Sequence, residues 1–200
     1  MNRVLAIAGS SGSGKSTLAG ELRSLLGPHC VAVLPVDAYY HDLSYLPHKD
    51  REAVNFDHPD AVDLDLFAHH VAQLREGKSI ARPTYDFITH CRLPETQIVE
   101  PRDWILAEGI LVAATALLRT TYNYLVFIDT PQGLRWQRRL ERDKRDRGRD
   151  NSSIESFWVR AEETFQEWGR AAFFEADVVV DGSQSPRKMM NDLLTKVALD

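Results

Sequence analysis

A glycine-rich segment, Gly9 to Thr17, constrains this chain more than any other feature of its sequence. It matches G-x-x-x-x-G-K-S, follows an apolar run at 4–8 and precedes a helical pattern at 18–26. Glycines allow backbone angles that side chains forbid, so successive N–H groups can converge on a phosphate at the positive end of a helix. Strand, loop and helix in this order predict a triphosphate-binding loop rather than a chance Gly/Ser-rich turn.

The phosphate loop also predicts individual roles. Lys15 would reach the β- and γ-phosphates, and the hydroxyl of Ser16 would face Mg²⁺. The loop alone does not indicate which group accepts the γ-phosphate. The residues that we expect to bind the nucleotide are Gly9, Gly12, Ser13, Gly14, Lys15, Ser16 and Thr17.

Length and composition narrow the class of protein. The 200 residues suit a single domain over 1–200, and the net charge of −5 argues against a general nucleic-acid binder. Cys30 and Cys91 lie far apart and form neither a disulfide framework nor a zinc motif. No apolar run approaches the roughly 20 residues that span a bilayer, and the start of the chain lacks a signal-peptide pattern. We therefore expect a cytoplasmic protein without membrane contact.

Carboxylates follow two of the predicted core strands. The apolar run at 31–36 is followed by Asp37, and the run at 104–107 is followed by Glu108. Ligands of open α/β sheets bind beyond the carboxyl ends of the strands, so both acids should lie beside the phosphate loop. Glu108 then suits a Mg²⁺ partner, while Asp37 is either a functional acid or a turn or helix-cap residue.

The alternation of strands and helices predicts an α/β fold of the P-loop NTPase type. We expect three αβα layers and a mostly parallel five-stranded sheet. Further core strands are predicted at 124–129 and 177–181, and further helices at 63–77, 113–119, 153–168 and 186–199. Aromatic side chains at helical spacing in 153–168, Phe157 among them, are interpreted as core. Asp63 should cap the helix that follows it, and Gly77 should end that helix.

Two insertions interrupt this pattern. Residues 38–62 form a long loop rich in aromatic residues, and a loop of this length in a compact domain is usually functional. Its aromatic rings beside Asp57 and Asp60 suit a ligand with a flat ring and several hydroxyls. The histidines of residues 41–70 match no metal-binding spacing, and we interpret them as solvated or turn residues. Residues 79–100 predict a small β-hairpin outside the main sheet, because prolines interrupt both arms.

A basic segment at 134–150 contains seven arginines after its first residue and before Asp150. Arg135, Arg138, Arg139 and Arg142 fall on one helix face. Such a run is most often a solvated charged surface. After a phosphate loop, it predicts a helical lid that closes arginines over the transferring phosphoryl group.

The sequence contains no Asn-Lys-x-Asp motif for guanine and no Asp-x-x-Gly switch after a central strand. A regulatory GTPase is therefore the weakest of the alternatives. A transport or motor ATPase would need partner motifs and usually a longer chain. A small kinase remains, with a substrate loop that carries an aspartate and an arginine lid.

Together these segments resemble the uridine–cytidine kinases of the phosphoribulokinase/uridine kinase group. The resemblance runs in family order over most of residues 3–181. Its most diagnostic parts are Asn-Phe-Asp-His-Pro-Asp-Ala at 55–61 and Tyr-Asp-Phe-x-x-His at 85–90. The other matching parts are Gly9 to Thr17, Val36 to Tyr40, Pro83 to Arg92, Glu108 to Leu111, and Arg138 to Asp150.

The resemblance implies transfer of the γ-phosphate of ATP or GTP, with Mg²⁺, to the 5′-hydroxyl of uridine and cytidine, the step of pyrimidine salvage that gives UMP and CMP. Asp37 matches the catalytic base of the family and lies near Mg²⁺, and Ser16 and Glu108 match the other metal positions. Asp57 and Arg149 match residues that hold the ribose hydroxyls. The remaining matches are Tyr40, Phe56, Tyr85 and Phe87 around the pyrimidine, His90 at the 4-position of its ring, and Arg139, Arg142 and Arg147 on the phosphates.

The chain departs from the family pattern after the lid. It has Phe157 and Arg160 where the family usually has glutamines, and 163–170 lacks the usual proline-rich phrase. These departures concern pyrimidine contacts and the subunit interface rather than the chemistry. The resemblance also implies a homotetramer and feedback inhibition by pyrimidine triphosphates. Two alternatives remain: a sister kinase acting on nicotinamide riboside, pantothenate or ribulose phosphate, and a non-catalytic nucleotide-binding regulator.

Overall fold

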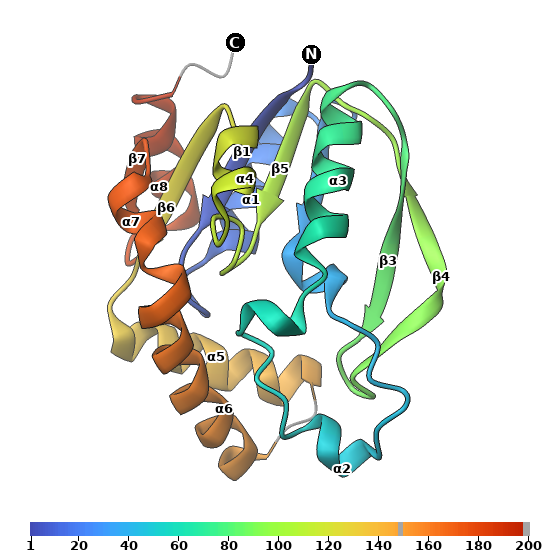
Figure 1. Ribbon diagram of the computed structural model, residues 1–200. Helices are drawn as coiled ribbons and strands as arrows, with labels where there is room; N and C mark the ends of the chain where they lie inside the picture. The colour runs from blue at the N-terminus through green and yellow to red at the C-terminus, as the bar shows by residue number, and fades with distance from the viewer. Residues whose placement is uncertain (148–149, 198–200) are drawn as a thin grey trace.

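The computed structural model describes residues 1–147 and 150–197, apart from the side chain of Arg147. Within these residues the main sheet has five parallel strands in the order β2-β5-β1-β6-β7 (Figure 1). This confirms the predicted sheet. Its strands are β1 (Arg3–Ala8), β2 (Val31–Pro35), β5 (Trp104–Glu108), β6 (Tyr124–Asp129) and β7 (Val178–Asp181).

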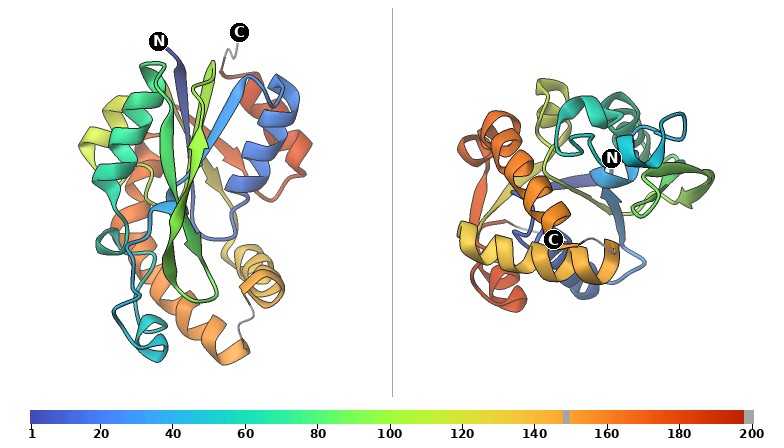
Figure 2. Two further views of the ribbon diagram at one scale, coloured as in Figure 1. Left: turned by 90° about the vertical axis from the view of Figure 1, so that its right-hand side faces the viewer. Right: turned by 90° about the horizontal axis from the view of Figure 1, so that it is seen from below.

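Helices cover both faces of this sheet, as a three-layer α/β fold requires (Figures 1 and 2). α1 packs against α8 on one face, and α3 packs against α4 on the other. The helices are α1 (Lys15–Leu26), α2 (His48–Arg51), α3 (Leu64–Arg75), α4 (Ala116–Thr121), α5 (Gln132–Arg147), α6 (Asn151–Thr164), α7 (Ala171–Glu175) and α8 (Pro186–Leu194).

The central strand β1 explains why there are two apolar cores. Side chains alternate across a strand, so a buried parallel strand must be apolar at every position. Val4 and Ala6 belong to the core under α3 and α4, whereas Leu5 and Ile7 belong to the core under α1 and α8. All four side chains are fully buried. The short apolar run before the phosphate loop therefore holds that loop on the most protected strand of the sheet.

Local signals set several helix ends where the sequence predicts them. The carboxylate of Asp63 accepts a hydrogen bond from the backbone N–H of Leu66 at 3.1 Å and caps α3. Gly27 ends α1 with φ of 92°, a conformation that glycine adopts at little cost. Other boundaries differ from the expectation. α4 begins at Ala116, because the Thr115 hydroxyl caps it, and α8 ends at Leu194.

Two further segments differ in a way that matters for the site. The strand predicted over 31–36 ends at Pro35, and Asp37 lies in the 3₁₀ turn η1 (Val36–Tyr39). The helix predicted over 153–168 is α6 followed by a π-helical turn, η3 (Phe165–Gly169). That turn leaves Trp168 at the surface, 36% exposed and edge-on to His58, instead of in the core. A wider turn rotates the residues beyond it around the helix axis.

The predicted hairpin is β3 (Ile80–Asp86) paired antiparallel with β4 (Cys91–Val99), apart from the main sheet. It stands beside β2, and its bend lies near the level of α2 (Figures 1 and 2). The loop between η1 and α3 contains α2 and the short turn η2 (Pro59–Ala61). Seen from below, α5 and α6 cross beneath the carboxyl ends of the strands (Figure 2). These elements surround the edge of the sheet where ligands bind.

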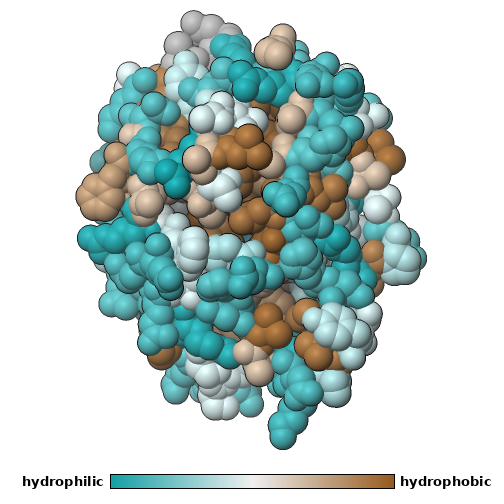
Figure 3. Space-filling view, viewed as in Figure 1, coloured by the Kyte–Doolittle hydropathy of each residue, from teal (hydrophilic) through white to brown (hydrophobic). Residues whose placement is uncertain are grey.

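The surface over α3, α4 and α6 is largely hydrophilic, with apolar side chains visible in the hollows between them (Figure 3). No helix in the described part of the chain is long and apolar enough to cross a membrane.

One buried histidine departs from the expectation of solvated histidines. The Nδ1 atom of His70 lies 2.9 Å from the hydroxyl of the fully buried Tyr39. A buried polar pair of this kind satisfies both groups.

Candidate active site

The phosphate loop joins β1 to α1, as the sequence predicts. Gly12 has φ of 77°, which favours glycine, and a Cβ there would lie 2.4 Å from the carbonyl oxygen of Arg135. The loop is therefore packed directly under α5. The Nζ atom of Lys15 donates a hydrogen bond to the Ser10 carbonyl at 3.0 Å, inside the curl of the loop. Side-chain bulk at position 12 is incompatible with this arrangement.

The loop and β5 meet through Ser16 and Glu108. The Ser16 hydroxyl donates to Oε1 of Glu108 at 2.9 Å. Burial raises the pKa of Glu108 above its ordinary value, and nearby Lys15 opposes that shift. Burial lowers the pKa of Lys15, and the carboxylates of Glu108 and Asp37 oppose that shift. A cation and two carboxylates thus share a confined space, and removing each of these charged groups from water costs free energy.

Asp37 reaches the same place from the neighbouring strand. Pro35, the last residue of β2, is paired in register with Glu108 of β5. Asp37 follows two residues later in η1, so its carboxylate lies on the same edge of the sheet as Glu108 and Lys15. The 3₁₀ turn, rather than a straight strand end, carries Asp37 over this edge. The predicted positions of both acids at one rim agree with this geometry.

These groups line one small cavity of about 60 Å³. Nine of the residues predicted for the site contribute to it, and Ser11, Ile110 and Phe157 join them. The cavity is lined by Ser11, Lys15, Ser16, Asp37, Tyr40, Phe56, Asp57, Glu108, Ile110, Arg139, Arg142 and Phe157.

α5 places two arginines in the cavity. The guanidinium of Arg139 is 3% exposed and lies 3.8 Å from the carboxylate of Asp57 and 3.5 Å from that of Asp143. Arg142 pairs with the same Asp143 at 2.8 Å. Asp143 is fully buried one helical turn after Arg139, and it holds both arginines toward the cavity. The Nη1 atom of Arg139 is buried and has no hydrogen-bond partner among the described residues.

The other two arginines on this face of α5 bind protein groups. Arg135 forms an ion pair with Glu162 of α6, and its Nη1 donates to the Ser10 hydroxyl at 2.7 Å. Arg138 donates to the Gly182 carbonyl at 3.0 Å. The predicted arginine face is therefore divided between scaffold and cavity. The side chain of Arg147 and all of Arg149 lie outside the described residues.

The predicted pyrimidine residues form an aromatic cluster next to the cavity. Tyr40 contacts both Phe56 and Tyr85 edge-on, each with ring centroids 5.2 Å apart. His90 stacks on Phe56 at 4.8 Å and 18° between planes, and Phe87 lies edge-on to Tyr85 at 5.4 Å. Tyr40 and Phe56 are among the described residues that line the cavity, whereas Tyr85, Phe87 and His90 contact these two rings without lining it. The predicted residues are thus brought together in two layers.

His90 has a strained backbone. Its φ of 55° is positive, and among the described residues it is the one non-glycine residue with this property. It lies in the bend between β3 and β4, and its side chain is buried. A left-handed conformation costs a residue with a Cβ roughly 1–2 kcal/mol. The fold accepts this cost and thereby turns the imidazole onto Phe56 rather than toward solvent.

Phe157 is the principal residue of the site that sequence reasoning missed. Its ring is nearly parallel to those of Phe56, at 6.2 Å, and His90, at 6.4 Å. The guanidinium of Arg160 covers Phe157 at 4.7 Å and donates to the Ala53 carbonyl at 2.8 Å. Phe157 and Arg160 therefore connect α6 to the loop at 38–62. The helical spacing of Phe157 predicts a core position, and the signal that points instead to the site is the departure from family glutamines at Phe157 and Arg160.

A second missed contact holds the hairpin. Arg92 of β4 donates to the carbonyls of Tyr39 at 3.0 Å and Tyr40 at 3.1 Å. The hairpin is thereby joined to η1, the turn that carries Asp37.

Within residues 1–147 and 150–197 no group of three or more His, Cys, Asp or Glu side chains is arranged to hold a metal ion.

Known proteins resemble this chain over nearly its whole length. The model of the phosphoribulokinase/uridine kinase family matches residues 4–187. A uridine kinase from Chloroflexus aurantiacus is 41% identical over 180 residues, which are 90% of this chain and 86% of that protein. A uridine kinase from Salmonella paratyphi B is 41% identical over 155 residues, or 76% and 73% of the two chains. The solved structure of phosphoribulokinase from Rhodobacter spheroides superposes with a TM-score of 0.66 at 12% identity, covering 90% and 70%.

Proposed function

The chain belongs to the phosphoribulokinase/uridine kinase family, and from that premise we propose that it transfers the γ-phosphate of ATP or GTP to the 5′-hydroxyl of uridine and cytidine. The products are UMP or CMP and the nucleoside diphosphate. The relatives named uridine kinase support a nucleoside acceptor. The observation that carries the proposal is the shared cavity in which Lys15, Ser16 and Glu108 face Asp37, Asp57 and Arg139.

Asp37 is the proposed base. It orients the 5′-hydroxyl toward the γ-phosphorus and accepts its proton late in a loose transition state. The bond from the 5′-oxygen to phosphorus forms as the bond to the β–γ bridging oxygen breaks, and the diphosphate leaves. Lys15 and Arg142 stabilise the charge that spreads over the phosphoryl oxygens. The buried Nη1 of Arg139, without a partner in the described part of the chain, suits a phosphoryl oxygen.

Mg²⁺ fits the oxygen atoms that this site offers. The ion is usually bound by one or two carboxylates together with substrate phosphate oxygens and water. The hydroxyl of Ser16, already 2.9 Å from Glu108, and the carboxylates of Asp37 and Glu108 provide such ligands. When bound, Mg²⁺ would neutralise charge on the β- and γ-phosphates. The raised pKa of Glu108 reflects the cost of a buried carboxylate that a cation would relieve.

Acceptor recognition is proposed to divide between ribose and base. Asp57, with Arg149, would bind the 2′- and 3′-hydroxyls, which penalises a deoxynucleoside because a buried carboxylate loses its partner. The aromatic cluster would hold the pyrimidine, and His90 would face its 4-position. An imidazole can donate or accept, so both the O4 of uracil and the amine of cytosine can be served.

The cavity of about 60 Å³ is too small for two nucleotide-sized ligands, since ligand pockets usually enclose about 300–1,000 Å³. We therefore propose that the arginine lid predicted at 134–150, which contains most of α5, moves away to admit substrates. Closure would exclude water from the phosphoryl group and limit hydrolysis. By analogy with the family we also expect a cytoplasmic homotetramer with feedback inhibition by pyrimidine triphosphates.

A coupled assay of ADP release against a panel of acceptors tests the proposal. Uridine and cytidine should support turnover, while nicotinamide riboside, pantothenate and ribulose 5-phosphate should not. Asp37→Asn should lower kcat by about 10²- to 10⁴-fold, because it removes the base and keeps the shape. Turnover with another acceptor alone would identify a sister kinase. Nucleotide hydrolysis that is indifferent to every acceptor would refute a kinase function.

A further inference from the structure

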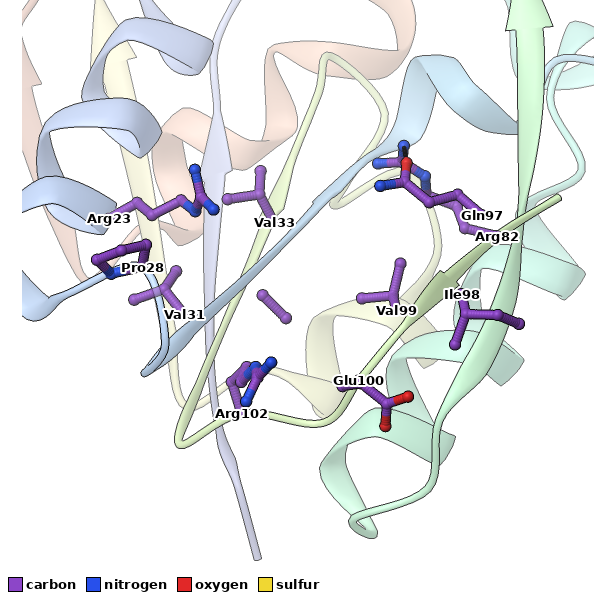
Figure 4. A pocket seen from close by; sticks show the side chains of 11 residues that line it. Arg23, Pro28, Val31, Val33, Arg82, Gln97, Ile98, Val99, Glu100 and Arg102 are labelled. Carbon is purple, nitrogen blue, oxygen red and sulfur yellow. Dashed lines mark hydrogen bonds between the residues drawn. The ribbon is translucent and has the colours of Figure 1, made fainter.

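A second cleft lies between β2, the edge strand of the main sheet, and the hairpin (Figure 4). Its volume is about 430 Å³, within the range of small-molecule sites. Val31 and Val33 of β2 and Val99 of β4 form apolar walls. Nothing in the proposed phosphoryl transfer uses this space, and no residue that lines it belongs to the catalytic cavity.

The charges in this cleft are unbalanced. Arg23 from α1, Arg82 from β3 and Arg102 from the segment before β5 all line it, against the single carboxylate of Glu100. In the described part of the chain none of these three arginines forms an ion pair. Arg23 and Arg82 extend from opposite sides of the cleft toward its middle (Figure 4). An anion bound between guanidinium groups from separate segments would be attracted by each of them.

Arg82 provides a second, independent indication that the cleft accepts an anion. Its Nη2 donates to the side-chain oxygen of Gln97 across the hairpin, which fixes the guanidinium plane. Its Nε is buried and has no hydrogen-bond partner among residues 1–147 and 150–197. A buried N–H group without a partner costs roughly 1–3 kcal/mol, and an anion bound beside it would offset that cost. This donor lies in a residue that lines the cleft.

We propose that this cleft binds a polyphosphate chain, either free or carried by a nucleotide. Arginine forks match phosphate oxygens in geometry and charge, and three of them can contact successive phosphates. The apolar walls would accept a base or sugar if the chain belongs to a nucleotide. The cleft is distinct from the catalytic cavity, because it lies on the outer side of β2 and uses none of the phosphate loop.

A bound anion would act on the hairpin. Arg82 belongs to the hairpin, whereas Arg23 and Arg102 belong to the body of the protein, so an anion between them joins the two parts. The hairpin carries His90 at its bend and contacts η1 through Arg92. If the proposed function holds, occupancy therefore regulates acceptor binding by fixing the orientation of the hairpin. The binding itself does not depend on the proposed function.

The test uses a Lys15→Ala background, which weakens phosphate binding at the catalytic site. Inorganic tripolyphosphate is titrated calorimetrically into this protein, and into versions that also carry Arg23→Gln with Arg102→Gln, or Arg170→Gln as a matched control. Arg170 is exposed and precedes α7, away from the cleft. Backbone hydrogen exchange of 80–99 is measured with and without the probe. No assay of activity is involved, so this test can fail independently of the kinase proposal.

We expect the Lys15→Ala protein to bind tripolyphosphate. Backbone hydrogen exchange in the hairpin should be slower with tripolyphosphate than without it. Arg23→Gln with Arg102→Gln should weaken that binding by about tenfold or more, while Arg170→Gln leaves it unchanged. ATP in place of tripolyphosphate identifies the source: tighter binding indicates a nucleotide, and equal or weaker binding a free polyphosphate. No binding to Lys15→Ala, or equal affinity in the double variant and the control, overturns the proposal.

Discussion

The two walls of the candidate active site are built in different ways. The proposed phosphate wall consists of Gly9 to Thr17 with Glu108, and most of it is one continuous segment that runs from the end of β1 into the first turn of α1. The acceptor wall combines the loop at 38–62, the bend of the hairpin and α6, which are far apart in the sequence. One wall follows from local backbone geometry, and the other depends on long-range packing.

Contacts within the acceptor wall show this dependence. The Asn55 side chain donates to the Thr164 hydroxyl at 2.7 Å, and Arg51 donates to the Thr89 carbonyl at 2.8 Å. These bonds join residues that are 109 and 38 positions apart. Phe157 adds its stacked contact with Phe56. If this wall binds the acceptor as proposed, we expect a substitution in one of its segments to change acceptor binding while the phosphate wall keeps its form.

Substitutions at two glycines, one in the phosphate loop and one within α1, should have the largest and most clearly separated effects on the phosphate wall. Gly12→Ala places a Cβ 2.4 Å from the Arg135 carbonyl at a positive φ, so we expect a loss of about 2–4 kcal/mol in unfolding free energy and a collapse of activity. Gly20→Ala is the matched control, because a Cβ there meets no atom within 4 Å in the middle of a helix. It should gain about 1 kcal/mol. Chemical denaturation measures both, and equal stability of the two variants would contradict the packing described.

The phosphate wall is also where the sequence was most informative. The apolar run of β1, the loop, and the ends of α1 follow from neighbours a few residues away. Asp37 could be placed at the rim, but its 3₁₀ turn could not be foreseen, because that turn depends on packing against the hairpin and α3. The helical spacing of Phe157 predicts a buried side chain, but it does not indicate which residues bury that side chain. Arg92 ends a segment that matches the family, but nothing in that segment predicts its hydrogen bonds to the carbonyls of Tyr39 and Tyr40.

The acceptor wall should respond separately through Phe157. Phe157→Leu keeps an apolar side chain but removes the stacked contact with Phe56 and His90. Since an aromatic pair contributes about 0.5–1.5 kcal/mol, the KM for uridine should rise roughly two- to tenfold with the KM for ATP unchanged. Phe174→Leu, at a position 74% exposed on α7, serves as the control. Steady-state kinetics with each substrate varied decides. An equal rise in both KM values would mean that the walls are not independent.

A smaller effect is expected at His70, which contacts Tyr39 in the same turn that carries Asp37. Burial, and next the neighbouring His69, lower the pKa of His70 below its ordinary value of 6.5, and Asp63 opposes this. The unfolded chain then binds a proton at a higher pH than the folded protein does. The unfolding free energy should therefore fall as the pH decreases below about 6.5, and the loss should end below the folded-state pKa.

Denaturation with urea at several pH values measures this slope. His70→Gln should reduce it, because glutamine cannot titrate and can still bond to the Tyr39 hydroxyl. His41→Gln, at an exposed position in the loop, should leave the slope unchanged. If the two variants show the same slope as the original protein, the contact between His70 and Tyr39 does not govern the acid sensitivity of this region.

The most direct test of the central claim is the fate of the γ-phosphate. Phosphorus NMR of a reaction with ATP, Mg²⁺ and uridine distinguishes a nucleoside 5′-phosphate from free phosphate. We predict one 5′-UMP for each ADP formed, with no stoichiometric release of inorganic phosphate, because the two walls bring Asp37 and Lys15 into one cavity. Formation of ADP with an equal amount of inorganic phosphate, and no 5′-UMP, would contradict the account.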